Sequence, residues 1–425
     1  MRVSIITNLA VKRDATSNIA RQQLDVVESY CRGRGEPFEA KLYAQECDIA
    51  DPRIHVVGSP EGLLADEHFH LSDVIVHHFL TYHTLFDAIH FAPRTARVVA
   101  TYHGITPPNL LPEQDRPLAY RSYQQAVNLA VADRVLTGSS HLHRELIGMG
   151  VPEHKLGVVP YTVPLPVKGP EFHEHEGSTT RLLYVGRYSP AKGLRELLHA
   201  AGRLREQGSD FELRLVGTRR FAAPEFLNEL ERLGRKMGLG GKLRMEFDVP
   251  GKELEEHYRW ADALVLPSYH EGFCVPVIEA MMFGCFPITT DAGALPETTG
   301  GLGHQCRAGD ERALAEVITR FVGERESGTV KTTSAGELTR EQWRERVSVH
   351  LEQFSSGNFE EGLREALFAG LEVLDINAKP LVAASRQRAF AGLRDGPADP
   401  PEPNFSHEEI ARALEASDPV QRNAG

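Results

Sequence analysis

The sequence predicts an α/β protein made of two doubly wound domains, each built on a parallel sheet with helices on both faces. Both halves of the chain alternate short, nearly continuous apolar segments with stretches of helical composition, which is the pattern of buried parallel strands. The first half contains RVSIIT, DVIVHHF, ARVVATYH and DRVLTGS. The second half contains RLLYVG, FELRLVG, KLRMEF, DALVLPS and GCFPIT.

An irregular segment, PYTVPLPVKGPEFHEHEGSTT, separates the halves, and its prolines and charges cannot continue either sheet. After about residue 325 the strands stop, and EQWRERVSVHLEQF and FEEGLREALFAGLEVL are amphipathic helical stretches. The expected parts are an N-terminal domain 1–165, a linker 166–180, a second domain 181–335, helices 336–372 and a partly mobile tail 373–425.

Composition and charge exclude several classes of function. A chain of 425 residues with 41% hydrophobic residues can bury a large core, and its formal charge of -12 argues against nucleic acid as a partner. The five cysteines lack CxxC spacing, and their odd number argues against a disulfide framework. No apolar run has the length of a membrane span, and the N-terminal apolar segment is too short for a signal peptide. We expect a cytoplasmic protein without integral membrane contact.

Two cations follow the first strand of the second half. RLLYVG leads into RYSPAKGLRELL, so Arg187 and Lys192 lie between a strand end and a helix N-terminus. Doubly wound sheets bind ligands at the carboxyl ends of their strands, and two cations beside a helix N-terminus suit a diphosphate. The alternative is a solvated loop with two ordinary surface cations.

Two carboxylates flank the start of another helix in VLPSYHEGFCVPVIEAMMFG. A side chain in the first helical turn leans toward the N-terminus, so Glu279 is expected to approach the loop that carries Glu271. Gly272 permits close backbone approach, and the amides of Gly272, Phe273 and Cys274 can donate to a ligand. Carboxylates accept hydrogen bonds from hydroxyl groups and repel phosphates, so a nucleotide sugar fits the layout. The alternative is a loop acid and a helix-start acid without a ligand.

EGFCVPVIEA resembles the E-x7-E signature of family 4 of the retaining glycosyltransferases, the glycosyl transferases group 1. Their GT-B architecture has two facing Rossmann-like domains, and the likeness runs from about residue 95 to about 325. It includes VGRYSPAKG, LVG ending at Gly217, WADALVLPSYHEGF and GCFPITTDAGALPE, and in the first half VVATYHGITPP and DRVLTGSSHLHREL. Residues 340–372 resemble the terminal helices that return to the first domain in this architecture.

The resemblance implies a role for each matching position. Arg187 and Lys192 bind the donor diphosphate, Glu279 binds the ribose hydroxyls, and Glu271 with the following amides binds the donated sugar. Gly217 is also expected among the donor-binding residues. His103 matches a histidine that faces the anomeric centre, although it could also simply cap a strand end. The implied reaction is retaining transfer of a hexosyl group from a UDP- or GDP-linked sugar to an acceptor hydroxyl by same-face attack, without a dedicated nucleophile.

The implied donor site needs no metal, because the sequence has no Asp-x-Asp motif and its cations can neutralise the diphosphate directly. The dense histidines His68, His70, His77, His78 and His83 have no acidic or cysteine partner at ligand spacing. His173 and His175 are interpreted as parts of a solvated linker.

The acceptor is less defined, because the loop NLAVKRDATSNIARQQ lacks the glycine pair usual in the family. Ser17 and Asn18 are expected to cap the next helix, and no acceptor residue is assigned. The modest Lys and Arg content of the first domain favours a soluble saccharide or small molecule. The alternatives are a GT-B epimerase or phosphorylase, a glycoside hydrolase using Glu271 and Glu279, or a non-catalytic sugar-nucleotide-binding subunit. The oligomeric state stays open.

Overall fold

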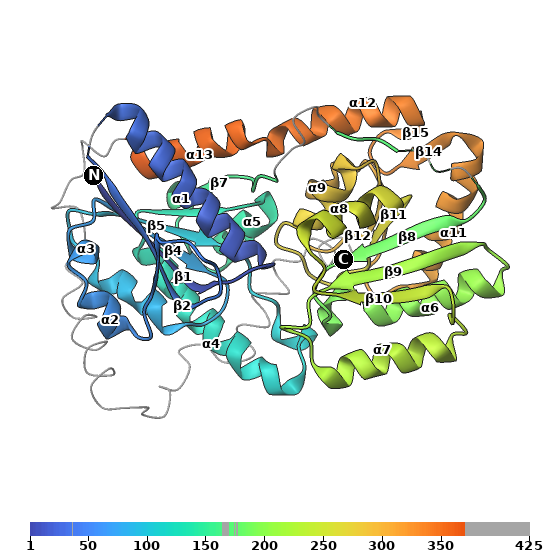
Figure 1. Cartoon of the computed structure of the whole chain (residues 1–425), viewed down its shortest axis with the longest axis horizontal. Helices are drawn as coiled ribbons and strands as arrows, with labels where there is room; N and C mark the ends of the chain where they lie inside the picture. Colours follow the sequence, from blue (N-terminus) through green and yellow to red (C-terminus); the bar gives the residue numbers. More distant parts are fainter. Residues whose placement is uncertain (36, 164–169, 174, 176, 370–425) are drawn as a thin grey trace. The chain divides into compact units, whose positions relative to one another are not determined.

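The computed structural model describes residues 1–35, 37–163, 170–173, 175 and 177–369 (Figure 1). The predicted tail 373–425 and part of the predicted linker lie outside this range. The chain forms two compact units. Unit 1 comprises Met1–Pro108, Glu113–Val159 and the described residues 359–369, whereas unit 2 comprises Asn109–Pro112 and the described residues of Pro160–Asn358.

Unit 1 contains a seven-stranded parallel sheet in the order β3-β2-β1-β4-β5-β6-β7. The order reverses between β1 and β4, where a doubly wound sheet opens a crevice. β4 is buried along its whole length, as its apolar run predicts. The strands are β1 Arg2–Ala10, β2 Glu39–Cys47, β3 Ile54–Val56, β4 Val74–Phe79, β5 Arg97–Tyr102, β6 Arg134–Thr137 and β7 Leu156–Val158.

The helix that follows β1 starts earlier than the sequence suggested. Asp14 is the N-cap of α1 (Ala15–Arg34), and its carboxylate accepts from the Ser17 amide at 2.8 Å. Ser17 therefore lies inside the first turn, and its hydroxyl donates to the Leu9 carbonyl. The other helices of this unit are α2 Pro60–Leu64, α3 Glu67–His70, α4 Arg116–Ala126, α5 Ser140–Gly148 and, from Phe359 on, α13 Ser356–Phe368. α13 packs beside α1, where the Phe368 and Tyr30 rings stack with centroids 4.1 Å apart.

Unit 2 contains a six-stranded parallel sheet in the order β10-β9-β8-β11-β12-β13, with the reversal between β8 and β11. The prediction of two doubly wound parallel sheets is confirmed. The strands are β8 Thr180–Val185, β9 Phe211–Gly217, β10 Leu243–Phe247, β11 Ala263–Leu266, β12 Phe286–Thr290 and β13 His304–Cys306, followed by an antiparallel pair, β14 Thr329–Thr332 and β15 Gly336–Thr339.

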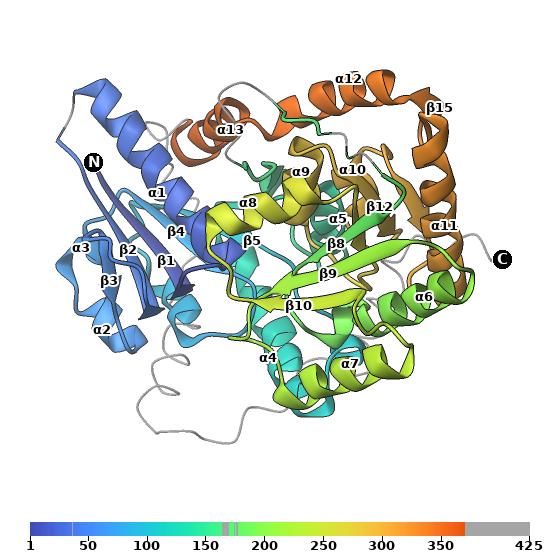
Figure 2. The same cartoon turned by 45° about the vertical axis from the view of Figure 1, so that its right-hand side comes forward.

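Helices cover both faces of the sheet in unit 2. α6 and α7 lie on one face and α8 and α9 on the other (Figures 1 and 2). α6 buries Leu194, Leu197, Leu198 and Ala201, the spacing of one helical face. α12 belongs to this unit, and the Trp343 indole nitrogen donates to the Leu302 carbonyl at 2.7 Å. The helices are α6 Leu194–Glu206, α7 Pro224–Lys236, α8 Gly251–Trp260, α9 Val275–Met282, α10 Leu295–Thr299, α11 Glu311–Ser327 and α12 Arg340–Leu351.

Candidate functional site

The loops after β8 and β11 meet at the reversal point of the sheet in unit 2. Such a point is where open α/β sheets bind their ligands. The loop after β8 passes through a 3₁₀ turn, Pro190–Lys192, and reaches α6 at Gly193. The loop after β11 holds Glu271 and leads into α9. Lys192 and Glu271 therefore come from loops on adjacent strands.

Gly193 fixes the contact between these two loops. Its φ is +67°, and a Cβ at this position would lie 1.9 Å from the Pro267 carbonyl oxygen. Only glycine tolerates both the conformation and the approach. The Tyr269 amide also donates to the Ala191 carbonyl at 2.9 Å. The two loops are therefore held together by backbone contacts.

Lys192 and Glu271 form a largely buried ion pair. The Lys192 ammonium donates to Glu271 Oε1 at 2.8 Å, and the Ser268 hydroxyl donates to the same oxygen at 2.7 Å. Burial by itself raises the pKa of Glu271, but the charge and hydrogen bond of Lys192 and the Ser268 hydrogen bond outweigh it and leave the pKa below its usual value. Glu271 is therefore an ionised acceptor close to a fixed cation.

A third loop, after β12, supports the backbone of Glu271. The Ala294 amide donates to the Glu271 carbonyl at 2.8 Å. Gly293 has a φ of +60°, and a Cβ there would lie 2.2 Å from the same carbonyl oxygen. The glycine in DAGALPE is thus required for this close approach, and it fixes the main chain that carries the carboxylate.

Gly217 ends β9 beside the strand that leads to Arg187. A Cβ on Gly217 would lie 2.2 Å from the Gly186 carbonyl oxygen. The Gly186 amide donates to the Val216 carbonyl at 3.0 Å, so the two strand ends run close together. Gly217 therefore shapes the loop before Arg187 through its missing side chain.

Arg187 is exposed, and the described residues provide no ion-pair partner for its guanidinium. It differs in this respect from Lys192, whose charge is already neutralised by Glu271. Of the two predicted diphosphate-binding cations, one is therefore available and the other is held by a carboxylate.

Glu279 lies on α9 and is held by a residue that the sequence did not suggest. The Tyr258 hydroxyl, on α8, donates to Glu279 Oε2 at 2.7 Å, and Tyr258 is 1% exposed. Burial raises the pKa of Glu279, and the hydrogen bond from Tyr258 offsets this only in part. Tyr258 thus fixes the orientation of a carboxylate whose second oxygen remains an acceptor.

The segment between the two carboxylates has an unusual backbone. Cys274, the N-cap of α9, has a φ of 74°, which a non-glycine residue adopts only where its surroundings impose it. The Phe273 ring is buried against Tyr161, and the Thr298 hydroxyl donates to the Phe273 carbonyl. Phe273 and Cys274 therefore contribute shape and backbone to the site, whereas the Phe273 side chain belongs to the core.

In unit 1, His103 lies just after β5 and is half-buried. Its Nε2 lies 2.9 Å from Nδ1 of His78, and the two rings are stacked. His78 Nε2 lies 3.0 Å from Oε1 of Gln23, on α1. Burial lowers the pKa of His103 to about 3, so the ring is neutral at neutral pH. The sequence had suggested His78 only as a member of a rejected metal cluster.

In the described part of the chain, three potential metal ligands come together only at Glu246, Glu253 and His257. An Arg214 guanidinium nitrogen lies 3.3 Å from His257 Nδ1. A metal-bound histidine normally donates its other ring proton to an acceptor, and an arginine is not one. This group therefore does not have the surroundings of a metal site.

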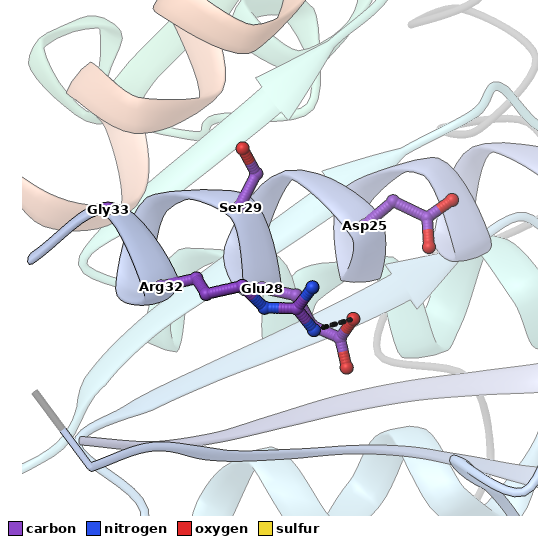
Figure 3. A pocket seen from close by; sticks show the side chains of 5 residues that line it. All are labelled: Asp25, Glu28, Ser29, Arg32 and Gly33. Atoms are coloured by element: carbon purple, nitrogen blue, oxygen red, sulfur yellow. Dashed lines mark ion pairs between the residues drawn. The ribbon is translucent and has the colours of Figure 1, made fainter. Parts of the chain in front are cut away.

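A hollow of about 470 Å³ along α1 is lined by Asp25, Glu28, Ser29, Arg32 and Gly33 (Figure 3). Its carboxylates already face arginines, since Arg53 lies 2.8 Å from Asp25 and 3.1 Å from Glu28. α1 leaves the carboxyl end of β1 and returns toward the amino end of β2, so its C-terminal half lies away from the strand ends that bind ligands. We do not assign a ligand to this hollow.

Sequence analysis thus missed Ser268, Tyr258, Gly293, His78 and Gln23 as parts of these sites. Ser268 and Gly293 stand within quoted motifs, so their position was a usable signal. Tyr258 and Gln23 carry no local signal, because Tyr258 reaches Glu279 only through the packing of α8 beside α9, and Gln23 reaches His78 only through the packing of α1 on β4.

Both sheets are doubly wound, and α/β proteins of this class bind their ligands at strand-end loops of the kind described above. Residues 170–332 match the model of the family Glycosyl transferases group 1. The two sheets, with the C-terminal helix, are those of GT-B glycosyltransferases.

Two curated relatives illustrate the likeness. The chain is 30% identical over 217 residues to an MMP alpha-(1->4)-mannosyltransferase of Mycolicibacterium hassiacum, covering 49% of this chain and 50% of the relative. It is 29% identical over 231 residues to a D-inositol 3-phosphate glycosyltransferase of Streptosporangium roseum, covering 50% of this chain and 52% of the relative. The chain therefore spans about half the length of the curated relatives it matches.

Solved structures match over more of the chain. The Anabaena protein HepE in complex with UDP-glucose superposes with a TM-score of 0.63 at 18% identity, covering 86% of this chain and 99% of that one. A glycosyltransferase from Rickettsia africae superposes with a TM-score of 0.62 at 16% identity, covering 87% and 99%. Among the described helices none is both long and apolar enough to cross a bilayer.

Proposed function

We propose that the protein is a retaining glycosyltransferase that moves a hexosyl group from a nucleotide-diphosphate sugar to an acceptor hydroxyl. The observation that supports this most is the ion pair between Lys192 and Glu271 at the reversal point of unit 2, inside the residues that match the family. It provides a cation for phosphate and an ionised acceptor for sugar hydroxyls from adjacent loops. Arg187 adds a second cation on the same loop as Lys192.

In the proposed reaction Arg187 and Lys192 neutralise the diphosphate as it leaves, Glu279 accepts hydrogen bonds from the ribose, and Glu271 accepts hydrogen bonds from the transferred sugar. The amides of Gly272, Phe273 and Cys274 donate to the same sugar. Binding of UDP-glucose by HepE and the mannosyl transfer in the relative's name support a hexosyl donor linked to UDP or GDP. We propose that no metal is required, because protein cations do the work of the ion.

The acceptor is proposed to be a soluble saccharide or small molecule, and the activity to be cytoplasmic. The name of the Streptosporangium relative, a D-inositol 3-phosphate glycosyltransferase, supports a small polar acceptor. No residue of unit 1 is assigned to acceptor binding.

The test is a thermal-shift panel of UDP, GDP, ADP and their hexose derivatives, followed by product analysis. A ligand at a hundred times its dissociation constant is expected to stabilise the protein by about 2.7 kcal/mol. Proton NMR of the product then reports whether the α configuration of the donor is kept. A panel without any shift would contradict the proposal. Donor isomerised without acceptor would indicate an epimerase, and donor binding without turnover for any acceptor would indicate a non-catalytic subunit.

A further inference from the structure

A continuous hydrogen-bond chain in unit 1 links α1, β4 and β5. The Gln23 amide nitrogen donates to the Thr101 hydroxyl oxygen at 3.2 Å. The Gln23 amide oxygen lies 3.0 Å from His78 Nε2, and His78 Nδ1 lies 2.9 Å from His103 Nε2. Gln23, His78 and Thr101 are each 1% exposed, so water does not compete for these contacts.

The proton positions in this chain follow from which atoms can donate. An amide oxygen only accepts, so His78 must carry its proton on Nε2. A neutral imidazole has a single ring proton, and His78 Nδ1 is therefore an acceptor. The facing nitrogen, Nε2 of His103, must then be the donor, and a neutral His103 keeps Nδ1 as its acceptor.

The imidazole rings of His78 and His103 are both neutral near pH 7. Burial lowers the pKa of His78 well below its usual value, and the neighbouring His103 lowers it further. Burial alone lowers the pKa of His103 to about 3. The fully buried position of His78 also favours the neutral form, because an imidazolium there would lose its hydration.

We propose that His78, itself anchored by Gln23, is a positioning residue that holds His103 as a neutral ring with its proton on Nε2 and its Nδ1 as a hydrogen-bond acceptor. The effect of this ring state on catalysis rests on the proposed function. The resemblance implies that His103 acts at the anomeric carbon, which gains positive charge during glycosyl transfer, so an imidazolium in that role would oppose the reaction. A neutral ring with an acceptor nitrogen instead suits a sugar hydroxyl.

Three variants separate positioning from packing. His78→Leu removes the acceptor for the His103 proton. His78→Asn places a neutral amide oxygen near the position of Nδ1 and can therefore again accept the hydrogen bond from the His103 ring proton. His77→Leu is the matched control, because His77 is the adjacent residue of β4, is 0% exposed, and packs against Phe86.

The first measurement is proton–nitrogen NMR of ¹⁵N-histidine-labelled protein, with the His103 signals assigned by their absence in His103→Gln. The wild type is expected to show a slowly exchanging His103 ring proton bonded to Nε2. His78→Leu should lose this signal, whereas His78→Asn and His77→Leu should retain it. A ring proton on Nδ1 of His103, or an unchanged signal in His78→Leu, overturns the inference.

The second measurement is steady-state kinetics with the donor found in the panel. His78→Leu is expected to lower kcat about tenfold, the effect of one well-placed hydrogen bond, and His78→Asn to stay within about threefold of wild type. An equal loss of kcat in His78→Leu and His78→Asn would assign the effect to packing and refute the positioning role of His78. If no donor is turned over, the proposed function fails, while the NMR result still decides the state of His103.

Discussion

Replacing Glu271 with Gln is expected to separate nucleotide binding from sugar transfer. In the free protein Glu271 holds the Lys192 ammonium at 2.8 Å, so a diphosphate must compete with this carboxylate for the cation. Glutamine has nearly the same shape and can still accept from Lys192 and Ser268, but it carries no charge. The substitution therefore weakens the contact between residue 271 and Lys192 and leaves no cavity in the site.

The size of the effect follows from the change in hydrogen-bond type. A hydrogen bond with a charged acceptor contributes about 1.5–3 kcal/mol, and a neutral one about 0.5–1.5 kcal/mol. Glu271→Gln should thus free about 1.0–1.5 kcal/mol for the diphosphate, which is about five- to thirteenfold tighter binding of UDP or GDP. At the same time kcat should fall by about 10² or more, because the sugar loses its ionised acceptor.

Isothermal titration with UDP and GDP measures the binding part, and Glu229→Gln is the matched control. Glu229 pairs with Arg195 on the same unit, with side chains 39% and 40% exposed, so this variant changes the net charge equally without touching Lys192. The control should alter the Kd by less than about twofold, since exposed charges are screened. Weaker or unchanged nucleotide binding in Glu271→Gln would refute the competition between carboxylate and diphosphate.

Three further outcomes are expected. Arg187→Ala should lower kcat about 10²- to 10³-fold, whereas Glu279→Ala should mainly raise the donor KM in the same steady-state assay; the reverse pattern would exchange their roles. Excess EDTA should reduce transfer by less than about twofold, and a near-total loss restored by Mg²⁺ or Mn²⁺ would contradict direct neutralisation by protein cations. His77 is 0% exposed with a folded pKa of about 3 against an unfolded 6.5, so the unfolded state binds its proton first and stability falls as the pH drops from 6.5 toward 3. At pH 5 the free energy of unfolding is therefore about 2 kcal/mol lower on account of His77. Urea unfolding at pH 7.5 and pH 5 should show that the His77→Leu variant loses about 2 kcal/mol less stability than the wild type over this range. An equal loss in both proteins would argue against the lowered pKa of His77.

The sequence alone determined the two doubly wound sheets, because buried parallel strands are apolar along most of their length, as in the LLYV of β8 and the ALVL of β11. It did not predict β2, whose segment EAKLYAQEC mixes charges with apolar residues, the short strands β3, β7 and β13, or the β14–β15 pair. Such strands owe their conformation to pairing with neighbours already in place, which no local pattern records.

The sequence also located the strand-end loops that carry Arg187, Lys192, Glu271 and Glu279, since their motifs follow directly after apolar strands. Their electrostatic state depended on the tertiary structure. Lys192 meets Glu271 because Gly193 lets one loop lie against Pro267 of the other, and Glu279 meets Tyr258 because α8 packs beside α9. Charge pairing across loops depends on distances of a few ångströms between residues far apart in the chain, and only folding sets those distances.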